Sequence, residues 1–302
     1  MTTQTSARRR ELGDELRRAR ERSGLTAAQL ADQLGWQPSK LSRVERGLNR
    51  CTEVEAAMLL GYLRAEPDEV RRILALCDDE ERGSWLQAFG NRLPDQLRTL
   101  ILSESTACAI ASVELNRIPG LLQTECYTRA MLCEAGLVPS AGVEPRVEAR
   151  QARQALLHRS NPPNFVFYIH EQALGLQIGG PAVMHEQMLY LVFAASQPGC
   201  VIRIIPTAAG AHAALDGPFR LMSFAEHHPV VYLETQNRSL VLEKPLDIAS
   251  YKLVLAKLAD QALSATESRS MLVDYASRYD VMEAAASDDS GDQVAEEQLQ
   301  RH

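Results

Sequence analysis

The residues best suited to direct contact with a partner molecule lie between positions 37 and 46. If residues 38–46 form a helix, Leu41 and Val44 lie three positions apart and face inward. The outward side chains are then all hydrogen-bond donors: Ser39, Lys40, Ser42, Arg43 and Arg46. Such donors on one short helix suit the base edges and phosphates of the DNA major groove. The pattern therefore predicts a helix that binds double-stranded DNA.

A reading helix of this kind needs a second helix that crosses it closely. Thr26 is a favoured N-cap, and the helix after it carries Ala31, whose small side chain permits a close crossing. Gly35 supplies the positive φ that the turn requires, and Pro38 suits the first helical turn. The same apolar and capping signals predict an all-α domain of five helices over residues 1–80.

The segment 25–47 resembles the Xre family of phage-repressor-type helix-turn-helix proteins, and the similarity extends over about residues 10–77. It rests on Ala31, Gly35, Leu41, Val44, Glu45 and Gly47. Pro38 departs from the polar residue often seen at its position. The resemblance implies a structural ion pair between Arg20 and Glu45.

The resemblance also implies which side chains touch DNA. Base contacts are expected from Gln37, Ser39 and Arg43, with Arg43 suited to a bidentate contact with guanine. Phosphate contacts are expected from Lys40, Ser42, Arg46, Asn49 and Arg50.

Residues 85–283 mix helical and strand-like segments, which predicts an α+β domain with a mainly antiparallel sheet flanked by helices. Segment 85–115 is expected to be helical, and the strands are expected near 165–170, 201–206, 219–225, 230–235 and 239–242. Residues 81–84 are the expected linker. The acidic segment 284–302 is expected to be a disordered tail.

The second domain resembles a domain of unknown function that is fused to Xre-type modules in actinobacterial regulators. Some members are antitoxin-like and are encoded beside a very small partner protein. The similarity rests on residues 118–127, 150–154, 179–184, 204–206 and 217–219. It identifies a family without implying a particular chemistry.

Two groups of polar residues in this domain are candidate contacts for an effector or a protein partner. Gln123 and Thr124 could bind a ligand or could cap a helix. Arg146, Arg150 and Arg153 share one helix face, which could grip an acidic partner or an anionic effector, or could be a solvated face with internal ion pairs.

Charge is segregated along the chain. The formal net charge is −7, yet residues 1–50 contain eleven Lys/Arg against six Asp/Glu, a local charge of +5. Residues 283–302 contain six acids and one arginine, a local charge of −5. Only the field near the phosphates matters for binding, so an acidic protein with a basic N-terminal domain is compatible with DNA binding.

Several other classes of protein are disfavoured by the sequence. Neither a signal peptide nor a transmembrane segment is apparent, so a cytoplasmic protein without membrane partners is expected. The six cysteines form no Cys-x-x-Cys pair, which predicts free, buried thiols. No catalytic motif, metal-binding motif or phosphate loop is present, so we expect no enzyme activity, metal or cofactor.

Two functions remain open. The first is a sequence-specific transcriptional regulator that acts as a dimer, because one such module covers only a half-site. Its second domain would receive a small-molecule or protein signal. The alternative is an antitoxin-like interaction protein that sequesters a small partner protein and regulates its own gene through DNA binding.

Overall fold

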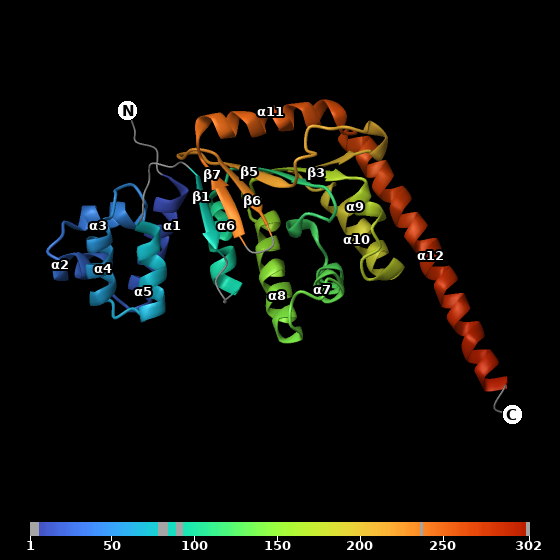
Figure 1. Ribbon diagram of the computed structural model, residues 1–302, viewed down its shortest axis with the longest axis horizontal. Coiled ribbons are helices and arrows are strands. Elements are labelled where there is room, and N and C mark those ends of the chain that lie inside the picture. The colour runs from blue at the N-terminus through green and yellow to red at the C-terminus, as the bar shows by residue number, and fades with distance from the viewer. Residues whose placement is uncertain (1–5, 78–83, 89–92, 236–237, 300–302) are drawn as a thin grey trace. The chain divides into compact units, whose positions relative to one another are not determined.

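Five helices occupy the N-terminal region, as the sequence predicts (Figure 1). The computed structural model describes residues 6–77, 84–88, 93–235 and 238–299. The helices are α1 (Ala7–Arg22), α2 (Ala27–Gln33), α3 (Pro38–Glu45), α4 (Glu53–Tyr62) and α5 (Pro67–Leu74). The side chains of Ser6, Thr26 and Thr52 cap α1, α2 and α4, and Pro38 and Pro67 lie in the first turns of α3 and α5. Local capping chemistry therefore sets these boundaries.

The helical module has its own apolar core. Leu16, Leu30, Ala31 and Leu41 are fully buried in one cluster. Ala31 lies in α2, where the sequence places a small residue, and Gly35 has a φ of +64° in the turn before α3. These positions fix the angle at which α2 meets α3.

Gly13 lies at a close backbone contact between α1 and α3. A Cβ atom at Gly13 would lie 2.6 Å from the carbonyl oxygens of both Val44 and Glu45. Gly13→Ala is therefore expected to destabilise the module by about 1–3 kcal/mol, because backbone atoms would have to move. Gly61→Ala is the control, since nothing lies within 4 Å of a Cβ there. Thermal unfolding of both variants tests this; equal stability would show that α1 and α3 separate at little cost.

The chain forms two compact units. The first contains residues 1–107 and 222–249, and the second contains residues 108–221 and 250–302. The helical module is thus grouped with part of the segment 85–283, which the sequence predicted as one separate domain. Of the expected linker, residues 81–83 lie outside the described residues, and Ser84 begins a strand.

The first unit contains an antiparallel set of strands in the order β1-β7-β6: β1 (Ser84–Ala88), β7 (Arg238–Leu242) and β6 (Val230–Glu234). Trp85 pairs with Val241, and Tyr232 pairs with the same residue from the other side. Helix α6 (Leu93–Thr106) belongs to this unit, and helix α11 (Pro245–Gln261) begins in it.

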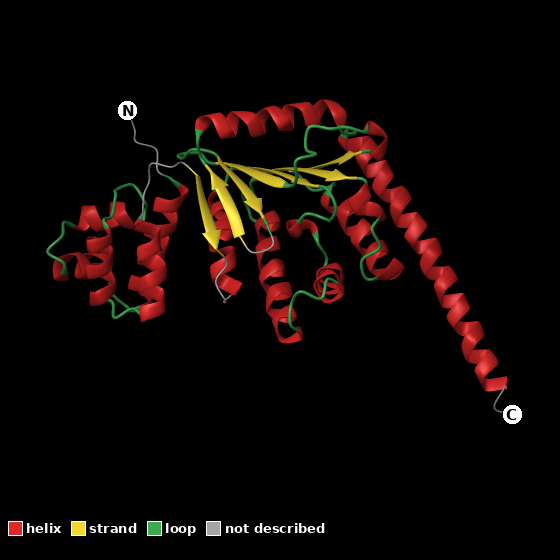
Figure 2. Ribbon diagram, viewed as in Figure 1, coloured by secondary structure: helices red, strands yellow, loops and turns green. Residues whose placement is uncertain are grey.

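The second unit contains three parallel strands in the order β2-β3-β4: β2 (Ala109–Glu114), β3 (Asn164–His170) and β4 (Cys200–Ile205). Parallel neighbours require crossover connections, which here contain helices. The first crossover contains α7 (Glu125–Glu134) and α8 (Val143–Gln154), and the second contains α9 (Gln172–Gly175) and α10 (Gly180–Ala194). Figure 2 shows these helices and strands in red and yellow.

The predicted fold class is confirmed. An all-α N-terminal region precedes an α+β region with a mixed, mainly antiparallel sheet flanked by helices. The strands expected near residues 165, 201, 219, 230 and 239 are all present, the third as β5 (Phe219–Ser223). The uniform helix expected over 85–115 is wrong, because β1 and β2 lie at its two ends. Both strands pair with segments far along the chain, and such tertiary pairing overrides local propensity.

The last helix corrects the prediction for the C-terminal segment. Helix α12 spans Ala265–Leu299, so residues 284–299 are helical where the sequence predicted disorder. Ala, Glu and Gln are abundant there and have high helix propensity, and extending an existing helix requires no new nucleation. Neither α12 nor any other helix in the described ranges is both long and apolar enough to cross a membrane.

The cysteines are free, but only some are buried. Cys51 and Cys200 are buried, and burial raises the pKa of these thiols to about 12 and about 11. Cys108, Cys126 and Cys133 are exposed, so the expectation of uniformly buried thiols is wrong. The local sequence around these residues does not specify which helix face is covered by the rest of the fold.

Candidate nucleic-acid interface

Helix α3 separates an apolar inner face from a polar outer face. Leu41 and Val44 are 0% and 2% exposed and anchor the helix in the module core. The outward positions predicted from the sequence are exposed at Gln37, Ser39, Ser42, Arg43 and Arg46. The helix therefore presents hydroxyl, amide and guanidinium groups to solvent from a fixed backbone.

Four of these side chains are uncommitted. Among the described residues, Gln37, Ser39, Ser42 and Arg43 make no side-chain hydrogen bond or ion pair. Backbone groups of Arg43 are satisfied, because its carbonyl accepts hydrogen bonds from Leu48 and Asn49. An exposed arginine on a rigid helix, with its guanidinium unpaired, can form a bidentate contact with an acceptor such as guanine.

Lys40 differs from its neighbours because its ammonium group is already bound. Its Nζ lies 2.6 Å from Oε1 of Glu55 and 4.0 Å from the centroid of the Trp36 ring. The hydrogen bond from Lys40 lowers the pKa of the Glu55 carboxyl. Glu55 also caps α4, because its carboxylate accepts a hydrogen bond from the backbone N–H of Thr52. The same carboxylate therefore binds both the N-cap of α4 and the ammonium group of Lys40. A phosphate at Lys40 would have to compete with Glu55.

Removing the charge of Glu55 should strengthen DNA binding at all sequences. Glu55→Gln preserves the capping box, because glutamine also serves at that position. It frees Lys40 and removes a carboxylate near the predicted phosphates, so the plot of log affinity against log salt should steepen by about one unit. Fluorescence anisotropy with one random duplex at several salt concentrations measures this.

Glu53→Gln is the matched control, because Glu53 is exposed on the same helix and makes no contact with Lys40. An equal effect of both variants would mean that overall charge, rather than release of Lys40, governs binding. An unchanged slope for Glu55→Gln would contradict a phosphate contact at Lys40.

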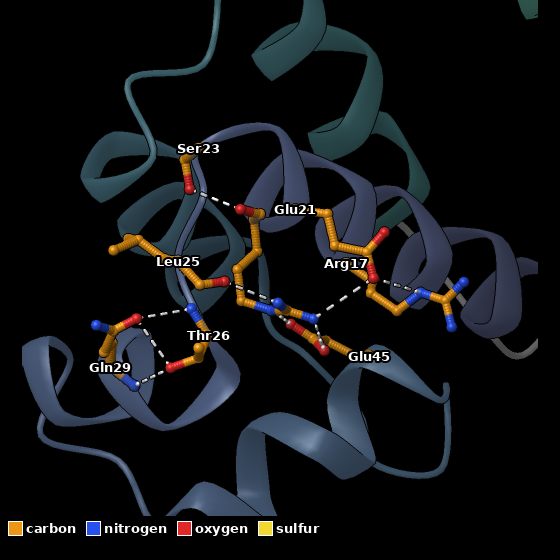
Figure 3. Close-up of polar contacts among 8 residues, drawn as sticks. Arg17, Glu21, Ser23, Leu25, Thr26, Gln29 and Glu45 are labelled. Atoms are coloured by element: carbon orange, nitrogen blue, oxygen red, sulfur yellow. Dashed lines mark hydrogen bonds and ion pairs between the residues drawn. The ribbon is translucent and has the colours of Figure 1, made fainter.

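A buried ion pair holds α1 against α3. Nε and NH2 of Arg20 lie 2.6 and 3.0 Å from the two carboxylate oxygens of Glu45, and NH1 donates to the carbonyl of Leu25. Figure 3 shows Glu45 and Leu25 at this contact, beside the capping pair Thr26 and Gln29. The structure thus joins the two residues that the family resemblance pairs, and gives them a structural role.

The loop after α3 contains the remaining predicted phosphate contacts. Gly47, which follows the C-cap residue Arg46, has a φ of +68°. Asn49 is half-buried, whereas Arg50 is exposed and already has an interaction partner within the protein. Both residues follow the C-terminal end of the reading helix in the sequence, and their DNA contacts stay predictions.

The candidate contacts in the second domain are largely engaged in internal bonds. Gln123 is 1% exposed; its Nε2 donates to the carbonyl of Ile118, and its Oε1 accepts from Arg150 at 2.5 Å and from Thr128. Gln187 accepts from the Thr124 backbone at 2.8 Å. The structure therefore brings Gln123 and Arg150 together in a buried network.

The other two predicted arginines have partners of their own. Arg146 donates to the carbonyl of Gly142, and Arg153 is half-buried and is not free of partners. Gln154 and Gln187, which complete the network, were not predicted. The available signal was a glutamine at an otherwise apolar helix face: Gln187 lies between buried Met184 and Leu191.

Comparison with known families gives two matches. Residues 11–73 match a helix-turn-helix domain, and residues 97–274 match a domain of unknown function, DUF5753. No curated protein and no solved structure matches the chain. The helix-turn-helix prediction is confirmed, while the narrower Xre and antitoxin-like assignments stay predictions. Since the second match covers more than half of the chain, the protein belongs to the DUF5753 family and carries an N-terminal helix-turn-helix DNA-binding domain.

Proposed function

We propose that this protein is a sequence-specific transcriptional regulator that binds DNA as a dimer. The observation that carries the proposal is the outer face of α3, where Gln37, Ser39, Ser42 and Arg43 are exposed and uncommitted. Side chains with internal partners would have to break those bonds before they could read DNA. Arg43, Gln37 and Ser39 contact bases in this proposal, and Lys40, Ser42, Arg46, Asn49 and Arg50 contact phosphates.

Dimerisation follows from the size of the module. One helix of this length covers only a half-site, and specific affinity generally needs two modules about one helical turn of DNA apart. In the proposal, residues beyond the helical module mediate dimerisation and receive a small-molecule or protein signal. Because its proposed target is DNA, the proposal also assigns the protein to the cytoplasm.

Selection from random DNA tests this function. The full-length protein is incubated with a randomised duplex library, and the bound fragments are sequenced through several rounds. A palindromic motif with half-sites about 10 base pairs apart is expected for a dimer. Enrichment of a single, non-palindromic half-site would support sequence-specific DNA binding but contradict binding as a dimer.

An absence of enrichment would favour the antitoxin-like alternative. In that function the main ligand is a small partner protein, and DNA binding serves autoregulation. Co-expression of the full chain with the product of an adjacent small gene, followed by size-exclusion chromatography, would then test for a stable complex.

A further inference from the structure

The first turns of α1 pack against a segment far along the chain. The backbone N–H of Ala7 donates to Oε1 of Glu243 at 2.6 Å, directly after strand β7. The guanidinium carbon of Arg10 lies 4.2 Å from the ring centroid of Phe224. Thr99 of α6 donates to the buried carboxylate of Glu11 at 2.6 Å. Three positions in the first two turns of α1 thus contact residues outside the helical module but inside the same compact unit.

This contact contains charges that are poorly compensated. Arg10 is only 8% exposed, and within the described part of the chain its NH1 and NH2 atoms are buried without a hydrogen-bond partner. Burial lowers the pKa of Arg10 to about 10, although the charge of Glu243 acts in the opposite direction. Burial also raises the pKa of the Glu243 carboxyl. Separation of the two surfaces would rehydrate both groups, which reduces the net stability of the closed contact.

The contact is mechanically coupled to the DNA-reading helix. A Cβ atom at Gly47, directly after α3, would lie 2.9 Å from the Cα and N atoms of Arg10. A Cβ atom at Gly13, about one turn further along α1, would lie 2.6 Å from the carbonyl oxygens of Val44 and Glu45. Because these are backbone contacts between packed helices, α1 and α3 move together.

Loop residue His227 is half-buried beside this contact. Burial and the charges of Arg10 and Arg46 lower its pKa, and its Nδ1 atom is buried without a hydrogen-bond partner among the described residues. Arg46 is a predicted phosphate contact.

We propose that the contact of Ala7, Arg10 and Glu11 with Glu243, Phe224 and Thr99 is a reversible dock that sets the orientation of the DNA-binding module. The dock leaves the reading residues exposed, so it does not occlude DNA. When closed, it holds α3 in one orientation, which favours simultaneous binding of two half-sites. When open, each module can still read a half-site, but the second half-site is no longer pre-aligned.

The segment 222–249 is joined to the second unit by continuous secondary structure at both of its ends. Strand β5 and helix α11, at its two ends, each have residues in both units. A change in the second unit would therefore be transmitted along the backbone to Phe224 and Glu243. A signal needs to supply only a small differential free energy to shift a contact that is itself marginally stable.

This inference rests on the proposed function. Its test uses the full chain and two duplexes taken from the random-library selection, one with two half-sites and one with a single half-site. Phe224→Ala and Thr99→Val should lower affinity for the two-site duplex about tenfold while changing half-site affinity less than about twofold. Hydrogen exchange of the α1 amides should become faster in both variants. Asp216→Asn, in an exposed loop, is the control.

A second variant, expected to keep the dock closed, distinguishes loss of the dock from simple misfolding. Arg10→Met combined with Glu243→Gln removes both buried charges and retains an acceptor for the Ala7 N–H. Because uncharged partners avoid the desolvation cost, the dock should stay closed and two-site affinity should be retained or rise.

Faster exchange in α1 with unchanged affinity for both duplexes would overturn the dock. An equal loss on both duplexes would also overturn it, because the contact would then support only the fold of the module. If wild type selects no motif, the proposed function fails and the inference falls with it. These results are distinguishable, since the first two require a wild-type protein that binds both duplexes.

Discussion

Replacement of Arg43 by alanine is expected to weaken specific DNA binding by about 1–3 kcal/mol, which corresponds to a loss of affinity between roughly fivefold and 150-fold. The physical reason is that Arg43 is exposed on α3 with no competing side-chain partner in the described residues. A bidentate guanidinium contact also carries base identity, so preference at one base-pair position should be lost. Repetition of the random-DNA selection with the variant measures both effects.

Arg71→Ala is the matched control for this experiment. Arg71 is an exposed arginine in the same module, on α5, with a partner in Asp68. Its loss should leave the selected motif unchanged. If Arg43→Ala lowers affinity equally for every sequence and keeps the motif, Arg43 binds phosphate and the assignment of base-reading residues is wrong.

Replacement of Arg20 by alanine is expected to destabilise the helical module by about 3–5 kcal/mol. The side chains of Arg20 and Glu45 are only 11% and 6% exposed, and two hydrogen bonds join them. Alanine would leave the Glu45 carboxylate buried without its main counter-charge, which costs more than the loss of a surface pair. Differential scanning calorimetry of the full-length protein should show a lower midpoint for the transition that contains the helical module.

Arg18→Ala separates this effect from a general loss of charge. Arg18 forms an ion pair with Asp14 on the same helix, and its side chain is 46% exposed. The expected cost is below about 1 kcal/mol, as for other exposed pairs. Equal destabilisation by Arg20→Ala and Arg18→Ala would show that the buried ion pair contributes no more to stability than any positive charge on α1.

The helix-turn-helix could be predicted because its signals are local. Thr26, Thr52 and Pro38 begin their helices through contacts within one turn, and Gly35 is required by the conformation of its own backbone. The inward spacing of apolar residues then specifies the outward face of α3 without reference to the rest of the chain. These features are determined within about 40 residues of sequence.

The α+β region could be predicted only in part. The strands β3 to β7 are recognisable from their composition, whereas β1 and β2 lie in a segment that resembles a helix locally. The parallel pairing of β2, β3 and β4 was not predicted. Strand direction depends on how the intervening crossovers return to the sheet, and no short window of sequence records that.

The sequence by itself determined the helical module, its turn and the chemical types on the reading helix. Tertiary structure alone decided which of those groups are free: Lys40 is bound by Glu55, whereas Arg43 is not. It also decided that Gln123 is buried among internal partners and that Arg10 lies against Phe224, more than 200 residues away. The physical reason is that capping and periodicity act over one or two helical turns, but burial and pairing of a side chain depend on segments that only folding brings together.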